Sequence, residues 1–254
     1  MTTTTTWSPM LEQYFGMKHR YPEAILLSRV GDFYEAYGDD AETIARALSI
    51  ALTSKEAGSG RRIAMAGVPH HALDGYLAKL VAQRRVVALA EQLEAPVPNK
   101  LVRRDIVRVV TPGTVIEEQM LERGAHTYLA ALCTVDDVVA LAHADVSTGH
   151  VAATAFAGEG AFEDGLTEIA RLDPAELVAD VPPDERTALE RALEGAATRI
   201  VAPALAAVTT PAPAPPVAGF SADESLAMRR ALDALATFVR RVGIQSGGEA
   251  FRPP

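Results

Sequence analysis

Short apolar runs alternate with helical patterns along residues 1–112, and this alternation restricts the fold more than any other feature. The run "AILLSRV" predicts a buried strand at 25–30, and "VVALAEQ" and "DIVRVV" predict two later strands. Apolar residues at helical spacing predict helices within 9–21, 38–50 and 71–85. Strands interleaved with helices indicate an α/β domain.

Two glycine-containing segments interrupt this pattern. The segment "SKEAGSGRR", residues 54–62, combines glycines with basic side chains and predicts a loop. The later "TPGTV" places a Pro-Gly turn between two β-branched runs. We therefore expect a domain boundary just after this turn, with one domain at 1–115 and a second at 125–254.

The second domain shows a different order of elements. "TYLAALCTV", "DVVALAHADVS" and "HVAATAF" predict three sequential strands. Helices are expected at 161–171 and at 184–195, the latter capped by Asp184, with the strand "AELVADV" between them. Three strands followed by alternating helices and strands is the order of a ribonuclease-H-like domain. The predicted fold is therefore α/β with two domains, an N-terminal mixed-sheet domain and a ribonuclease-H-like domain.

The C-terminal part carries two further patterns. "TTPAPAPP" predicts an extended, stiff spacer. A long helix is expected over 221–242, and its predicted buried face consists of Leu232, Leu235, Val239 and Val242.

Charge is unevenly distributed along the chain, whose net charge is −9. Residues 1–120 contain 14 Lys and Arg against 14 Asp and Glu, whereas residues 121–254 contain 10 against 19. Within residues 55–108 there are 10 basic side chains and 5 acidic ones. A surface that faces phosphates is therefore compatible with the first half only.

Three features bear on the cellular location. The chain has no apolar run of about eighteen residues, the length that a membrane span needs. The stretch "MTTTTTWSPM" lacks the basic and then apolar pattern of a secretory signal. The single Cys133 lies in an apolar stretch and is expected to be a buried thiol. We expect a cytoplasmic protein that makes no contact with a membrane.

The stretch "SRVGDFYEAYGDDA" places aromatic side chains and a carboxylate directly after the first strand. In an extended segment Phe33 and Glu35 project to one side and Tyr34 to the other. An aromatic ring can stack on a base or wedge between base steps and kink the duplex. A carboxylate is repelled by phosphates and is useful near DNA only where it reaches a base edge. The spacing alone leaves two interpretations open, a base probe and ordinary core packing, of which core packing is the commoner.

Several longer motifs carry a family resemblance. "LLSRVGDFYEAYGDDA", "MAGVPHHALDGYLAKLV", "VALAEQLEAP" and "RDIVRVVTPGTV" resemble successive motifs of the MutS family of bacterial DNA mismatch-repair proteins, in order and spacing. "YLAALCTVDDVVALAHADVSTGHV" and "LDPAELVAD" resemble the family's second, connector domain. The resemblance implies a mismatch-recognition domain at 1–115, a connector domain at 125–254, and binding of mismatched or looped duplex DNA.

The resemblance also implies roles for individual residues. In the family, the Phe of a Phe-x-Glu motif stacks on the mispaired base and the Glu forms a hydrogen bond with it, which assigns these roles to Phe33 and Glu35. The loop after "ALT" and the "MAGVPHH" segment are expected near the DNA backbone. Together with the basic segment they make these residues candidates for backbone contacts: Lys55, Arg61, Arg62, His70 and Arg108.

Some family features are absent from this sequence or altered in it. The family's ATPase domain binds ATP and magnesium and forms the dimer, but no G-x-x-x-x-G-K-[ST] motif occurs here. We therefore expect no ATP hydrolysis and no cofactor in this chain, and a dimer only with the C-terminal part of the family. The segment "PVPNKLVRRD" lacks a glycine common in the family, and Ser54 stands where many relatives have Lys. The connector implies a MutL-type repair protein as a possible partner.

Two other functions compete with this hypothesis. A ribonuclease-H-like domain can carry a two-metal nuclease site, here built on Asp145 and Asp180 with Asp136 or Glu168 as a third acid. The simpler interpretation is that Asp145 accepts hydrogen bonds in its own "DVSTG" turn. The chain could instead be a pure docking module that binds a repair partner through its acidic second half. Adjacent His70 and His71 point in different directions and lack other ligands, so no metal site is expected there.

Overall fold

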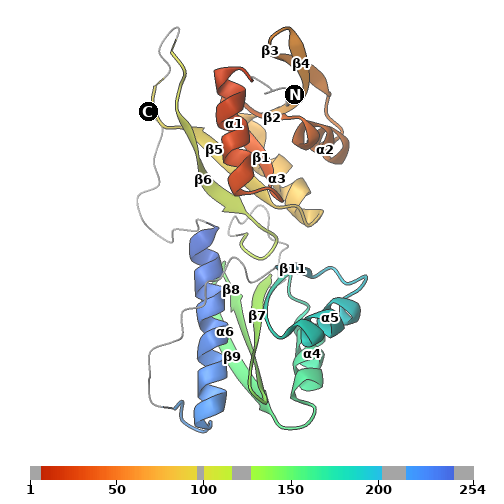
Figure 1. Ribbon diagram of the computed structural model, residues 1–254, viewed down its shortest axis with the longest axis vertical. Helices are drawn as coiled ribbons and strands as arrows, with labels where there is room; N and C mark the ends of the chain where they lie inside the picture. Colours follow the sequence, from red (N-terminus) through yellow and green to blue (C-terminus); the bar gives the residue numbers. More distant parts are fainter. Residues whose placement is uncertain (1–6, 96–99, 116–126, 202–215, 243–254) are drawn as a thin grey trace, which may run out of the picture. The chain divides into compact units, whose positions relative to one another are not determined.

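The computed structural model describes residues 7–95, 100–115, 127–201 and 216–242. The chain forms two compact units, which divide between Thr111 and Pro112 (Figure 1). Each unit is a mixed α/β structure built on one mixed sheet, as the α/β pattern predicts. The expected domain limits, 1–115 and 125–254, stay predictions. Residues 209–215 of the predicted proline-rich spacer lie outside the described residues. The same holds for residues 96–99 of the segment "PVPNKLVRRD", which lacks the glycine common in the family.

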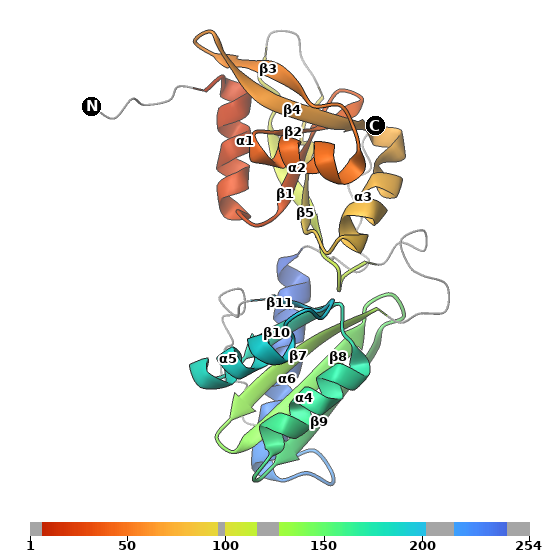
Figure 2. The same cartoon turned by 90° about the vertical axis from the view of Figure 1, so that its right-hand side faces the viewer.

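The first unit contains a six-stranded sheet with the order β3-β4-β2-β1-β5-β6. Strands β1 and β5 are parallel, and all other neighbours are antiparallel. Helices α1 and α3 lie on opposite sides of β1 and β5 (Figure 2). The elements are α1 (Pro9–Arg20), β1 (Ile25–Val30), β2 (Phe33–Tyr37), α2 (Asp39–Leu48), β3 (Thr53–Gly58), β4 (Arg61–Pro69), a 3-10 turn (His70–Ala72), α3 (Leu73–Ala82), β5 (Val87–Gln92) and β6 (Arg104–Val110).

The prediction of a loop at 54–62 is wrong, because these residues form the tip of a β-hairpin, with the end of β3, a two-residue turn and the start of β4. The two strands join at Ser59 and Gly60, which both have positive φ, 53° and 74°. A two-residue hairpin turn of this kind requires positive φ at both positions, and glycine adopts it without strain. The basic side chains therefore stand on paired strands, which hold them more firmly than a loop would.

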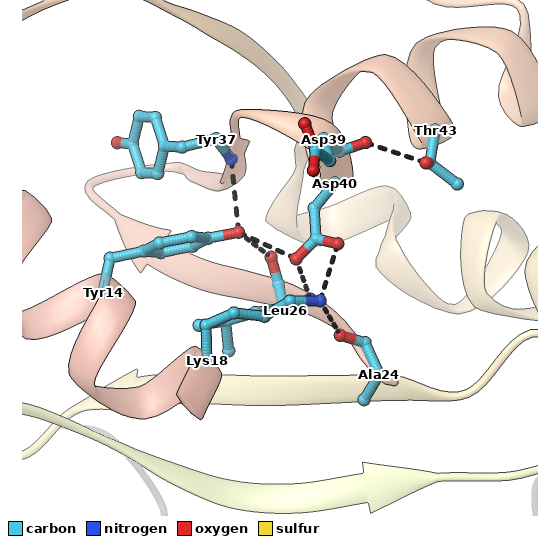
Figure 3. A network of polar contacts seen from close by, with 8 residues as sticks. All are labelled: Tyr14, Lys18, Ala24, Leu26, Tyr37, Asp39, Asp40 and Thr43. Atoms are coloured by element: carbon cyan, nitrogen blue, oxygen red, sulfur yellow. Dashed lines mark hydrogen bonds and ion pairs between the residues drawn. The ribbon is translucent and has the colours of Figure 1, made fainter. Parts of the chain in front are cut away.

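A buried carboxylate joins three elements of the first unit (Figure 3). Asp40, at the start of α2, is 7% exposed, and its Oδ2 accepts a hydrogen bond of 3.0 Å from the backbone N–H of Leu26. Lys18 of α1 donates to Asp40 Oδ1 at 2.8 Å. The Tyr14 hydroxyl lies 2.9 Å from the Leu26 carbonyl oxygen and 3.3 Å from Asp40 Oδ2, so it can donate to either. Burial, and next the charge of Asp40, raise the pKa of Tyr14.

The same hydroxyl also fixes strand β2. Tyr14 Oη accepts a hydrogen bond of 3.2 Å from the backbone N–H of Tyr37 (Figure 3). The Tyr14 and Tyr37 rings pack edge to face, with centroids 4.9 Å apart. Both rings are almost fully buried. The end of β2 is thus anchored to α1 by a ring contact and a backbone hydrogen bond.

The second unit contains a five-stranded sheet with the order β11-β10-β7-β8-β9. Strands β7, β8 and β9 are antiparallel, and β10 is parallel to both β7 and β11. Helix α6 covers one face of this sheet, and α4 and α5 lie on the other (Figures 1 and 2). The elements are β7 (Tyr128–Val135), β8 (Val138–Asp145), β9 (His150–Ala157), α4 (Ala161–Leu172), β10 (Glu176–Asp180), α5 (Pro183–Ala192), β11 (Arg199–Val201) and α6 (Ala222–Arg241).

Three details of the second unit differ from the sequence-based predictions. Asp184 does not cap α5, because Pro182 is the N-cap and Asp184 lies within the first turn. The three-residue strand β11 was not predicted. On α6, the predicted Leu232 and Val239 are only half-buried. The buried face combines alanines with three larger side chains, of which Leu235 was predicted, and it includes Ala227, Met228, Ala231, Ala234, Leu235 and Phe238.

The prediction of a buried thiol is confirmed. Cys133 is fully buried, and burial raises its pKa to about 12.

Within the described ranges of both units, no helix is both long and apolar enough to cross a membrane.

Replacing Asp40 by alanine should destabilise the first unit by about 3 kcal/mol, because Lys18 and the Leu26 N–H lose a buried charged partner. The matched control is Asp39→Ala, which removes an exposed carboxylate from the same helical turn and should cost less than about 1 kcal/mol. Urea unfolding followed by the fluorescence of Trp7, the only tryptophan of the chain, measures both changes. Equal effects of the two substitutions would contradict the anchoring role of Asp40.

Candidate nucleic-acid interface

Phe33 is exposed at the tip of a paired strand. It is the first residue of β2, it follows the turn at Gly31 and Asp32, and 46% of its surface is exposed. Its strand neighbours are Val30 of β1 and Pro69 of β4. Backbone pairing on both sides therefore fixes where the ring emerges.

The other face of β2 is buried. Tyr34 is 5% exposed, and its hydroxyl donates to the carboxylate of Glu91. Burial, and next the hydrogen bond with Glu91, raise the pKa of Tyr34. The alternation of an exposed Phe33 with a buried Tyr34 shows that core packing accounts for Tyr34 and leaves the exposure of Phe33 unexplained.

Glu35 lies on the same sheet face as Phe33 but is held against the sheet. Its side chain is 15% exposed. One carboxylate oxygen, Oε2, accepts hydrogen bonds from Lys55 Nζ at 2.8 Å and from the Tyr37 hydroxyl. Lys55 Nζ also donates to Tyr37 Oη at 3.0 Å and lies 5.4 Å from the centre of the Tyr37 ring. The structure thus brings Lys55, expected near the DNA backbone, into contact with Glu35.

Two further groups shape the electrostatics beside Glu35. Burial, and next the hydrogen bond with Glu35, raise the pKa of Tyr37, which keeps its hydroxyl protonated. Burial lowers the pKa of Arg104, while Tyr37 and Glu35 oppose that change. The Arg104 guanidinium donates to the carbonyl oxygens of Arg29 and Val102 at 2.7 and 3.0 Å. Tyr37 and Arg104 were not among the site residues predicted from the sequence. The sequence shows only that one is a tyrosine and the other an arginine.

The remaining backbone candidates do not form one cluster with Phe33. His70 directly follows Pro69, the strand partner of Phe33, and its N–H donates to the Asp32 carbonyl oxygen at 2.9 Å. Arg61 and Arg62 lie at the opposite end of β4. The strand register places Arg108 opposite Leu89, on the sheet face away from Phe33.

Arg61 and Arg62 have partners within the first unit. The Arg61 guanidinium lies 5.8 Å from the centre of the Trp7 ring. Arg62 donates to the hydroxyl and carbonyl oxygens of Ser54 at 2.8 and 2.7 Å. Both side chains are exposed beside the hairpin turn, so each keeps a surface on which an anion could bind.

The acids of the alternative nuclease site are separated. Asp145 Oδ1 accepts hydrogen bonds from the N–H and hydroxyl of Ser147 at 3.0 and 2.6 Å, which confirms the turn interpretation. Asp180 pairs with Arg230 at 2.9 Å. Asp145 is paired with Tyr128 of β7, and Asp180 is paired with Cys133, five residues farther along the same strand. Within the described part of the chain, no three His, Cys, Asp or Glu residues form a group that could hold a metal ion.

Comparison with known proteins adds an independent observation. Residues 8–119 match the family described as MutS domain I. The chain is 44% identical over 170 residues to the DNA mismatch repair protein MutS of Pelotomaculum thermopropionicum, covering 66% of this chain and 20% of that protein. It is 46% identical over 174 residues to the protein of the same name from Methanothrix thermoacetophila, covering 68% of this chain and 20% of the relative. The chain therefore spans about a fifth of the length of the curated relatives it matches.

The different exposures of neighbouring aromatics give a stability prediction. Phe33→Ala should change the free energy of unfolding by less than about 1 kcal/mol, because nearly half of the ring is already in water. Tyr34→Ala should cost about 3 kcal/mol, because that ring is buried and bonded to Glu91. Urea unfolding of both variants checks the pair. A large loss of stability for Phe33→Ala would show that this ring serves packing.

Proposed function

Because residues 8–119 of this chain belong to the MutS family as its domain I, we propose that the chain recognises mispaired or looped duplex DNA to initiate mismatch repair. Recognition is assigned to the first unit, and no catalytic step is assigned to the chain. The observation that carries the proposal is the exposed ring of Phe33 at the tip of a rigid strand. The relatives named DNA mismatch repair protein MutS support the class of function.

The discrimination rests on the deformability of the duplex. All duplexes share one phosphate backbone, so contacts with Lys and Arg strengthen binding without marking an error. A ring that wedges between base steps must unstack them, which costs a few kcal/mol. A mispaired or unpaired base resists this deformation less than a paired one. Phe33 would then stack on the disturbed base, a contact worth about 1–3 kcal/mol.

Glu35 has a second role in the proposal. Its carboxylate lies on the sheet face from which Phe33 emerges, as the strand alternation requires. It would accept a hydrogen bond from the edge of the base on which Phe33 stacks. On an intact duplex that edge is inaccessible, and the carboxylate only opposes the approach of phosphates. The acid therefore lowers the affinity for normal DNA and contributes at a disturbed pair.

Backbone contacts are proposed for the basic candidates. His70 is the best placed of these beside Phe33, since it follows the strand partner Pro69. Arg61 and Arg62 stand at the other end of the hairpin and could contact phosphates farther along the duplex. Arg108 faces the opposite side of the sheet and would contact DNA only if the duplex reached that face.

The second unit is proposed to be a ribonuclease-H-like connector. The support is its sheet, in which three antiparallel strands are extended by two parallel ones in the order β11-β10-β7-β8-β9. A MutL-type partner for this unit, a dimer, and the ATP and magnesium chemistry of the family are properties of longer proteins and are proposed only for a protein that includes those parts.

Phe33→Ala should abolish the preference for a duplex with one G·T pair over the matched homoduplex, lowering affinity for the mismatch about fivefold or more. Fluorescence anisotropy with labelled duplexes at a fixed low salt concentration measures both affinities. Leu52→Ala is the control, because Leu52 is an exposed apolar residue of the same unit at 51% exposure. Retention of the preference by Phe33→Ala, or its absence from the unmodified chain, would refute the proposal.

Glu35→Ala should act in a different way. Removing the carboxylate takes away a negative charge and releases Lys55, so affinity for the homoduplex should rise about twofold or more. Discrimination should fall because the base loses its acceptor. The same anisotropy titrations report both changes, and a fall in homoduplex affinity would contradict the assigned role.

A further inference from the structure

Both donors that hold Glu35 bind the same oxygen. Lys55 Nζ and the Tyr37 hydroxyl converge on Oε2. Within the described part of the chain, no hydrogen bond involves the other oxygen, Oε1. The carboxylate is therefore anchored by one oxygen and keeps the second as an acceptor.

The two anchors differ in rigidity. Tyr37 is 2% exposed, packs edge to face on Tyr14, and is bonded to Tyr14 Oη through its backbone N–H. Its hydroxyl is therefore a fixed point. Lys55 stands on the edge strand β3, where its side chain is 33% exposed, and it must reach across β4 to arrive at Glu35.

A glycine makes room for this arrangement. Gly67 of β4 is the strand partner of Glu35. A Cβ atom at this position would lie 3.4 Å from Glu35 Cγ and 3.1 Å from the Tyr34 carbonyl oxygen. A side chain here would therefore crowd Glu35 on the strand that separates it from Lys55.

The anchors also change the local charge. A bare carboxylate beside Phe33 would repel the phosphates of any duplex. Lys55 forms an ion pair with it at 2.8 Å, and Arg104 adds a second positive charge nearby. Glu35 can thus offer a hydrogen-bond acceptor while part of its repulsion of phosphates is compensated.

We propose that Lys55 and Tyr37 are positioning residues that hold Glu35 by Oε2 and present Oε1 to the base beside Phe33. The inference rests on the proposed function, because it concerns how the recognition site discriminates. It assigns Lys55 to specificity, whereas its charge and place in the sequence had suggested a contact with the DNA backbone.

These two roles of Lys55 predict changes in different measured quantities. A lysine that contacts phosphate strengthens binding to every duplex, and its loss lowers the salt dependence of binding by about one unit of slope. A lysine that positions Glu35 affects the ratio of mismatch to homoduplex affinity, and its effect requires Glu35. A double-mutant cycle separates the two, because the affinity ratio shows a coupling energy between Lys55 and Glu35 only if Lys55 acts on discrimination through Glu35.

The experiment measures both affinities, over a range of salt concentrations, for Lys55→Met, Glu35→Gln and the double variant. We expect Lys55→Met to lower the mismatch-to-homoduplex ratio about fivefold in the unmodified background and less than twofold in the Glu35→Gln background. The salt slope should stay constant. Lys55→Arg should retain most of the ratio, and Lys79→Met, which removes an exposed lysine from α3, is the control.

Tyr37→Phe tests the second anchor without disturbing the ring contact with Tyr14. It should lower the ratio about twofold to threefold. A readout without DNA accompanies it: the carbon-13 resonance of the Glu35 carboxyl group should shift in both Lys55→Met and Tyr37→Phe, and unchanged resonances would overturn the anchoring.

The outcomes separate this inference from the proposed function. If Phe33→Ala abolishes the preference while Lys55→Met weakens all duplexes equally in both backgrounds and lowers the salt slope, the positioning role is wrong and the proposed function stands. If the unmodified chain shows no preference, the proposed function fails, and the presentation of Glu35 to a base fails with it.

Discussion

The structure of the first unit depends on the buried carboxylate of Asp40 and the hydroxyl of Tyr14. A buried charge is tolerated only where several donors satisfy it, and here the donors come from α1 and β1. The same hydroxyl accepts from the N–H of Tyr37 at the end of β2 (Figure 3). One polar network therefore sets the position of the strand whose other end carries Phe33. An exposed ring can act as a wedge only if its strand does not yield.

The alternation along β2 divides its residues between the buried core and the proposed recognition site. Tyr34 and Ala36 face the buried side, whereas Phe33, Glu35 and Tyr37 share the other. On this second face, exposure falls along the strand from 46% at Phe33, through a side-chain value of 15% at Glu35, to 2% at Tyr37. Tyr37 is thus at once a core residue and the fixed support of Glu35. Replacing Tyr37 by phenylalanine separates these roles, because it removes the hydroxyl that supports Glu35 and keeps the ring that packs in the core.

The sequence predicted most elements of the fold but not the exposure or partners of the site residues. Apolar periodicity was sufficient for β1, α2 and the antiparallel strands of the second unit, because burial produced that periodicity. It missed the β3–β4 hairpin, whose strands carry Lys, Glu and Arg and lack an apolar alternation. It also overestimated the burial of Leu232 and Val239, because the buried face of α6 is centred on Ala227, Ala231, Ala234 and Phe238 instead. The exposure of Phe33 depends on the turn and the strand register, which single-residue patterns do not contain.

The contact between Lys55 and Glu35 shows why charge counts alone misassign such residues. The two are twenty positions apart and lie on strands separated by β4, so neither spacing nor composition brings them together. Counted as a free cation, Lys55 adds to a field that attracts any duplex. Paired with Glu35 it adds little to that field, because the two charges offset each other at 2.8 Å. A site that must reject normal DNA benefits from this second arrangement, since attraction to phosphate is the same for correct and mispaired duplexes. Under the proposed function, the specificity of this surface therefore depends on which of its charges are already neutralised within the protein.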